Sequence, residues 1–302
     1  MMSSHRRSWW QRLHIDVPLL LGLLALLGVS LVVLYSASGM HPESQVDQAV
    51  MATREAVFPH RADRLNRRED ADNAVEVAAF RHTVTMRAEH DSRQALVRAL
   101  HMADDIAKLF PISPNVYDAF CVSERELFVP QGMALHAYKL DALPLASNQW
   151  ISSPLTVAKM TEALTCKGAD SVLEIGCGSG YQALILSKLI RRVFTIERIE
   201  RLLKEAKERF KVLGVTNIHT RYDDGQNGWR EFAPYDRILF SASTPEVPQK
   251  LFEQLKIGGI LVAPIEKGHK QIITRFIKTQ EGIHKEALDE CLFVPVKDGR
   301  EY

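Results

Sequence analysis

Residues 171–181 read Ser-Val-Leu-Glu-Ile-Gly-Cys-Gly-Ser-Gly-Tyr. The stretch begins with an apolar run of strand type, continues with three glycines at alternate positions, and leads into an apolar run of helical type at 183–189. Glycine lets the backbone approach a ligand closely, so a strand, a glycine turn and a helix in this order predict a nucleotide-binding βα unit. The alternative is a glycine turn that binds no ligand.

Two acidic residues accompany the glycines. Glu174 precedes them, and Glu197 ends the next apolar run, about where a ribose-binding carboxylate belongs. The spacing G-x-G-x-G differs from the dinucleotide fingerprint G-x-G-x-x-G. An acid, three alternate glycines and a second acid are typical of S-adenosylmethionine (SAM) methyltransferases of class I. We therefore expect Glu174, Gly176, Gly178, Gly180 and Glu197 to bind SAM.

The residues after this unit alternate between helical and strand patterns. Apolar residues recur at helical spacing over 199–210. Strands are predicted at 215–220, 237–242 and 259–264, with a final strand pair at 271–277 and 291–296. This alternation predicts an α/β fold with a doubly wound, Rossmann-like sheet. The turn Asp224-Gly225 follows one strand at its carboxyl end, where open α/β sheets bind ligands.

A second candidate site lies at residues 152–154, Ser-Ser-Pro. Ser153 suits the N-cap of a helix, and Pro154 suits the first helical position. Ser152 then lies at a helix N-terminus, where backbone N–H groups and the helix dipole favour an anion. The residues alone leave open whether both serines only cap the helix.

Composition limits the classes of function. The chain has 302 residues, is 46% hydrophobic and 25% charged, and carries a net charge of +1, which predicts a globular protein and gives no reason to expect a nucleic-acid partner. Its four cysteines form no C-x-x-C pair and no metal-ligand spacing. We expect free thiols, no metal site and a reducing compartment.

The N-terminal third differs from the rest. Residues 1–107 contain 12 Arg and no Lys, which suggests two segments of different origin. Residues 17–39 are uncharged and mostly apolar, long enough for a transmembrane helix; a cleaved signal peptide or a buried helix is the alternative. We expect an N-terminal segment over 1–40, a charged linker over 41–101 to which no fold is assigned, and the catalytic domain over 102–302.

Residues 13–16, the apolar run and residues 34–39 resemble the start of the RodA branch of the SEDS cell-wall polymerases. The resemblance covers about 40 residues and only the first of that family's membrane helices. No second hydrophobic span follows, so the polymerase function is not carried over.

The region 102–302 resembles the protein-L-isoaspartate O-methyltransferases. The matching stretches are 124–130, 150–160, 172–182, 224–225, 234–236, 245–248, 258–264 and 293–296. The resemblance implies that SAM methylates the free carboxylate of isoaspartyl residues in damaged proteins. It implies that Ser152 is the active-site serine, that Glu197 contacts the ribose, and that Asp224 and Gly225 contact the adenine.

One loop departs from the family pattern. Ala146, Asn148 and Trp150 stand where the pattern Gly-x-Gly-Gln-Thr-Ile-Ser has glycine, glycine and threonine. A SAM methyltransferase with another acceptor is therefore the second hypothesis, and a membrane-anchored, non-catalytic fusion is the third.

Location and partners follow from the same reading. The arginines before residue 17 would export the following domain by the positive-inside rule, whereas SAM and free thiols belong to the cytoplasm. We expect a cytoplasmic, monomeric catalytic domain that acts on isoaspartyl proteins and peptides. Membrane contact is expected through residues 17–39 alone.

Overall fold

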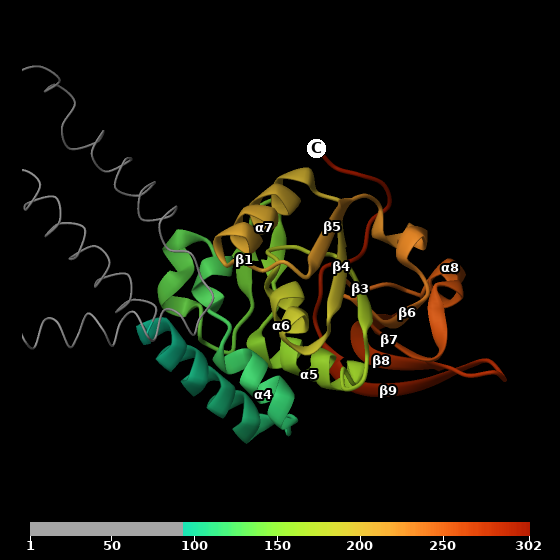
Figure 1. Cartoon of the computed structure of the whole chain (residues 1–302), viewed down its shortest axis with the longest axis horizontal. Helices are drawn as coiled ribbons and strands as arrows, with labels where there is room; N and C mark the ends of the chain where they lie inside the picture. Colours follow the sequence, from blue (N-terminus) through green and yellow to red (C-terminus); the bar gives the residue numbers. More distant parts are fainter. Residues whose placement is uncertain (1–92) are drawn as a thin grey trace, which may run out of the picture. The chain divides into compact units, whose positions relative to one another are not determined.

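The computed structural model describes residues 93–302, whose centre is a seven-stranded sheet of order β5-β4-β3-β6-β7-β8-β9 (Figure 1). The strands are β3 (Ser171–Ile175), β4 (Arg192–Glu197), β5 (Ile218–Tyr222), β6 (Tyr235–Phe240), β7 (Leu255–Lys267), β8 (Lys270–Lys278) and β9 (Ile283–Cys291). The five neighbouring strands β5, β4, β3, β6 and β7 pair in parallel. Strand β8 pairs antiparallel with β7, and β9 pairs antiparallel with β8. The chain runs outward from β3 in both directions, so the sheet is doubly wound as predicted. A ligand crevice is expected at the carboxyl end of β3, where the strand order reverses.

The strands bury alternate residues in two separate cores. Val172 and Val193 pack into one core with helices α5 (Pro154–Leu164) and α6 (Tyr181–Leu189). Leu173 and Phe194 pack into the other, with helix α8 (Gln249–Glu253). Because successive side chains of a strand point to opposite faces, these helices cover opposite sides of the sheet (Figure 1). Both central strands are almost wholly buried, which explains their continuous apolar sequence.

Helix α7 (Glu200–Val212) follows β4 and carries an apolar stripe. Its buried residues are Leu202, Leu203, Ala206 and Phe210. The predicted helical spacing over 199–210 is therefore confirmed.

The predicted final strand pair is half right. Strand β8 covers the first member, but its partner is β9 at 283–291 and not residues 291–296. Strand β9 lies at the edge of the sheet and is mostly exposed, so its polar sequence shows no apolar alternation. Residues 292–296 form no strand, and their only sheet-like contact within the described chain is an isolated bridge between Pro295 and Ser243.

A small N-terminal layer precedes the sheet. A helix occupies residues 93–109, followed by α4 (Pro114–Cys121), the 3-10 turns η2 (Arg125–Phe128) and η3 (Gln131–His136), and the hairpin of β1 (Leu143–Leu145) and β2 (Gln149–Ile151). The first of these helices includes residues 93–101, which the sequence placed in the linker.

The expected membrane helix at 17–39 and the polymerase-like start lie outside the described residues. Within 93–302, no helix is long and apolar enough to cross a bilayer.

Candidate SAM and acceptor site

The glycine turn after β3 depends on left-handed backbone. Gly176, Gly178 and Gly180 have φ angles of 92°, 54° and 93°. A Cβ on Gly180 would lie 2.7 Å from the Phe210 ring, so this glycine lets the turn pack on α7. A Cβ on Gly178 would meet nothing within 4 Å, and Gly178 lines the pocket beside the turn. Gly180 therefore allows the turn to pack closely on α7, and Gly178 leaves space for a ligand in the pocket.

Glu197 ties this turn to the end of β4. One carboxylate oxygen accepts a hydrogen bond from the Gly178 amide at 2.8 Å, and the other accepts one from the Ile199 amide at 2.9 Å. The side chain is buried, and burial raises the pKa of the carboxyl while the two amide donors oppose that rise. Glu197 thus forms part of the pocket wall with its oxygens fixed in position.

Glu174 lies beneath the turn and does not line the pocket. Its carboxylate accepts hydrogen bonds from Thr195 Oγ1 at 2.6 Å and from Ser241 Oγ at 3.0 Å. Complete burial raises the pKa of Glu174 to about 8, and the two hydroxyl donors oppose that rise. The residue joins the carboxyl ends of three adjacent strands.

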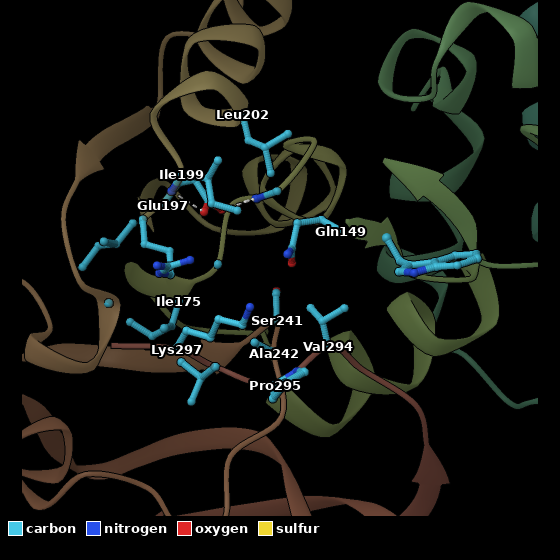
Figure 2. A pocket seen from close by; sticks show the side chains of 17 residues that line it. Gln149, Ile175, Glu197, Ile199, Leu202, Ser241, Ala242, Val294, Pro295 and Lys297 are labelled. Carbon is cyan, nitrogen blue, oxygen red and sulfur yellow. Dashed lines mark hydrogen bonds between the residues drawn. The ribbon is translucent and has the colours of Figure 1, made fainter. Parts of the chain in front are cut away.

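The pocket draws its wall from segments far apart in the sequence. It is lined by Gln149, Trp150, Ile175, Gly176, Gly178, Ile196, Glu197, Arg198, Ile199, Leu202, Gly225, Ser241, Ala242, Val294, Pro295, Val296 and Lys297. Figure 2 shows Gln149, Glu197, Ser241 and Lys297 around this space. Of the predicted cofactor residues, Gly176, Gly178, Glu197 and Gly225 line it, whereas Glu174, Gly180 and Asp224 do not.

Asp224 instead fixes the loop that carries Gly225. Its carboxylate accepts hydrogen bonds from the backbone amides of Gln226 and Gly299, each at 3.0 Å. The first bond caps the 3-10 turn η4 (Gly225–Asn227), and the second holds the C-terminal segment. The predicted Asp224-Gly225 pair is therefore at the site, with Gly225 on the pocket wall.

The C-terminal segment crosses the carboxyl ends of the strands. Two backbone hydrogen bonds join Ser243 to this segment. The Ser243 amide donates to the Val294 carbonyl at 2.8 Å, and the Ser243 carbonyl accepts from the Val296 amide at 2.7 Å. Near the chain end, Arg198 pairs with Glu301 at 2.8 Å. Sequence reasoning did not place residues 294–297 in the site, because only the folded sheet brings them beside the glycine turn.

Ser152 and Ser153 have different roles at the start of α5. Ser153 Oγ accepts a hydrogen bond from the Thr156 amide at 3.1 Å, so Ser153 is the N-cap and Pro154 the first helical residue, as predicted. The Ser152 hydroxyl makes no hydrogen bond with any described residue, and Ser152 does not line this pocket. Its carbonyl oxygen accepts one from Arg125 Nη2 at 2.8 Å.

Arg125 was not predicted as a site residue. Its guanidinium is fully buried and lies 4.7 Å from the centre of the Tyr181 ring. Nε and Nη1 have no hydrogen-bond partner among the described residues. Burial lowers the pKa of Arg125 to about 10, so the side chain stays charged at neutral pH. In the sequence, Arg125 stands between Glu124 and Glu126, and nothing there marks it as buried.

The substituted loop keeps a backbone that its residues allow. Asn148 has φ 55°, and asparagine tolerates this left-handed conformation, so it can replace the glycine of the family pattern. Ala146 has no positive φ and needs no glycine. The departures at 146 and 148 therefore leave the hairpin intact, and Trp150 is the remaining difference.

The described residues form neither a metal-binding cluster nor a disulfide. Residues 93–302 contain no group of three or more His, Cys, Asp or Glu side chains that could hold a metal ion. All four cysteines are free thiols, as predicted.

A doubly wound parallel sheet, a glycine turn after its first strand and a carboxylate at the end of the next define a class I SAM-dependent methyltransferase. Within that class, the model of the family "Protein-L-isoaspartate(D-aspartate) O-methyltransferase (PCMT)" matches residues 93–301. The chain belongs to this family. It is therefore an enzyme that uses SAM and methylates isoaspartyl residues of proteins.

Curated relatives carry the same family name. The chain is 53% identical over 199 residues to protein-L-isoaspartate O-methyltransferase of Helicobacter pylori strain J99, covering 66% of this chain and 95% of the relative. It is 46% identical over 185 residues to the enzyme of Dictyoglomus thermophilum, covering 61% and 84%.

Two solved structures share the fold. A protein-L-isoaspartate O-methyltransferase has a TM-score of 0.60 at 26% identity, covering 66% of this chain and 65% of that one. A putative member from Plasmodium falciparum, in complex with S-adenosyl-L-homocysteine, has a TM-score of 0.60 at 21% identity, covering 66% and 98%.

Proposed function

We propose that the residues of this site divide the repair methylation of L-isoaspartyl carboxylates between a cofactor side and an acceptor side. On the cofactor side, Gly176, Gly178 and Gly225 let SAM approach the backbone, and Glu197 accepts hydrogen bonds from the ribose hydroxyls. The observation that carries this assignment is the Glu197 carboxylate held on the pocket wall by the amides of Gly178 and Ile199. Each carboxylate oxygen keeps a free lone pair for a hydroxyl.

The remaining predicted cofactor residues, Asp224, Glu174 and Gly180, do not line the pocket and position the residues that do. The Asp224 carboxylate accepts hydrogen bonds from two backbone amides, so it holds its own loop in place. Through this loop, Asp224 positions Gly225 beside the adenine. Glu174 supports the turn from below, and Gly180 packs it on α7.

On the acceptor side, Ser152 orients the isoaspartyl carboxylate. A carboxylate is already ionised at neutral pH, so it needs no strong base to attack the methyl group. A carboxylate oxygen forms the new O–CH3 bond while the S–CH3 bond breaks and its electron pair stays on sulfur. No proton moves. The protein has to hold the two reactants in line and remove water from between them. The Ser152 hydroxyl has no hydrogen-bond partner in the described part of the chain and lies just before the N-cap of α5, so it can donate the orienting hydrogen bond.

The test of acceptor identity compares an isoaspartyl peptide with its aspartyl twin. The purified full chain should methylate the first with SAM and leave the second unchanged. Equal methylation of both, or of neither while SAM binds, would favour another acceptor. Failure to bind SAM in a titration would favour a non-catalytic domain.

We also propose that the catalytic domain is monomeric and works in the cytoplasm. SAM is held there, and four free thiols suit a reducing compartment. Fractionation of the native protein, followed by size-exclusion chromatography, tests both statements. Catalytic domain recovered outside the cytoplasm would contradict the proposed location, and a dimer would contradict the monomer.

A further inference from the structure

Trp150 is a large aromatic side chain on the wall of the pocket with no partner among residues 93–302. It is 55% exposed, and its indole makes neither a ring contact nor a hydrogen bond with the described residues. It nevertheless lines the pocket together with Gln149 and the glycine turn. The exposed indole is therefore available to a molecule that binds beside this pocket.

The hairpin fixes Trp150 on the same side of the chain as Ser152. Strand β2 pairs with β1 so that Trp150 lies opposite Pro144, and Ser152 directly follows Ile151, the last residue of the strand. Side chains alternate along an extended chain, and Ile151, between the two, is buried. Residues two apart on such a chain are about 7 Å apart. Trp150 and Ser152 therefore lie two residues apart on the side of the chain opposite Ile151.

An acceptor peptide has the same spacing. If Ser152 holds the isoaspartyl carboxylate, a residue one or two positions away along the peptide lies about 3.5–7 Å from it. That distance brings a flanking side chain onto the indole. Trp offers a large, rigid apolar face, and such residues carry much of the binding energy in peptide and protein interfaces.

We propose that Trp150 is a specificity-determining residue that packs against the residue flanking the isoaspartate, and that the enzyme favours isoaspartyl peptides with an apolar or aromatic residue there. The inference rests on the proposed role of Ser152. Threonine, the residue of the family pattern at this position, offers no such face. The preference is thus a property of this chain.

The test uses the full chain and two isoaspartyl peptides that differ only in the flanking residue, Phe or Ser. Trp150→Ala should raise KM for the Phe peptide about tenfold, the effect of losing one contact of about 1.4 kcal/mol. It should change kcat by less than about twofold. It should also change KM for the Ser peptide by less than about twofold, because that peptide has no apolar side chain to pack on the indole. Trp150→Phe should keep most of the preference, whereas Trp150→Thr should behave like the alanine variant.

Two controls separate this role from others. Ile257→Ala removes a similarly exposed apolar side chain, 64% exposed and away from the pocket, and should leave both KM values unchanged. SAM affinity, measured by titration, is a second readout because Trp150 also lines the pocket, and the change in KM for the Phe peptide should exceed any change in SAM affinity. Tryptophan emission of the wild type should also change when the Phe peptide binds, and this change should be absent in Trp150→Phe.

Different failures point to different errors. Equal KM changes for both peptides, unchanged KM for both, or a loss of SAM affinity in place of the peptide effect would overturn the role of Trp150. In those cases the wild type still methylates isoaspartyl peptides. A wild type that methylates neither peptide would overturn the proposed acceptor, and this inference with it.

Discussion

Arg125 donates a hydrogen bond from Nη2 to the carbonyl oxygen of Ser152 at 2.8 Å. The donor is a fully buried cation that forms no ion pair with any described residue, and its guanidinium lies over the Tyr181 ring. Tyr181 begins α6, directly after the glycine turn. One buried guanidinium therefore contacts both Ser152 and the residue that follows the glycine turn, and we interpret Arg125 as a positioning residue for the proposed acceptor serine.

Replacement of Arg125 by Met should lower activity more than stability. Met keeps much of the apolar stem and removes the bond to Ser152, and a hydrogen bond from a charged group contributes about 1.5–3 kcal/mol. We expect kcat/KM for an isoaspartyl peptide to fall about tenfold or more by that measure. The melting temperature should change little, because removal of a lone buried charge offsets the lost contacts.

The control for this experiment is Arg98→Met. Arg98 pairs with Glu126 at the surface, and the pair is partly exposed. Its loss should change neither activity nor stability much. If Arg125→Met unfolds the protein, or leaves kcat/KM unchanged, Arg125 does not position Ser152 in the way we propose.

Glu197→Ala should weaken SAM binding about tenfold or more, since a charge-assisted hydrogen bond contributes about 1.5–3 kcal/mol. The substitution also leaves the amides of Gly178 and Ile199 without their acceptor. Glu200→Ala is a suitable control, because the Glu200 side chain forms an ion pair with Lys204 on the surface of α7 and does not line the pocket. Isothermal titration with SAM measures both variants, and equal affinities in the two would refute the assignment of Glu197.

Ser152→Ala and Ser153→Ala should separate catalysis from helix capping. The first should reduce turnover while SAM affinity and the melting temperature stay near normal. The second removes the bond to the Thr156 amide and should cost about 1 kcal/mol of stability. Undiminished turnover in Ser152→Ala would reduce that residue to a helix-end position, and a methylated Ser152 intermediate would contradict its orienting role.

Local sequence patterns predicted the centre of this fold and not its edges. The strand, glycine turn and helix at 171–189 show in the sequence because β3 is buried and the turn needs left-handed backbone. Strand β9 lies at an exposed edge, so no apolar period marks it.

The site was predictable only where chemistry and local pattern coincide. Glu197 ends a strand and is acidic, so both signals point to it. Arg125 and Lys297 become site-related only through the fold: Arg125 contacts Ser152 across 27 residues, and Lys297 lies more than a hundred residues after the glycine turn that it joins in the pocket. No spacing rule relates such residues.

Glu174 should make stability depend on pH. Its pKa is raised by burial to about 8 in the folded protein, above its ordinary value of 4.5. Between these two pH values the folded state therefore binds more protons than the unfolded state. The contribution of Glu174 to the free energy of unfolding is fully present below the lower pKa and is lost as pH rises through the upper one. Glu174→Gln should remove this dependence, so the difference in melting temperature between wild type and variant should change between pH 5.5 and 8.5. A constant difference would show that Glu174 is not protonated in the folded protein.

The N-terminal boundary of the catalytic domain gives the last prediction. The helix at 93–109 buries Ala95 and Ala99, which precede the sequence-predicted start at 102. A fragment 90–302 keeps both side chains, whereas 102–302 loses them. At about 0.8 kcal/mol per buried methyl-sized group, we expect a loss of about 1.6 kcal/mol. For a domain of this size the corresponding decrease in melting temperature is about 5 °C. Both fragments should bind SAM and methylate isoaspartyl peptide. If 90–302 is insoluble or inactive while the full chain in membranes is active, the preceding residues belong to the enzyme and this division of the chain is wrong.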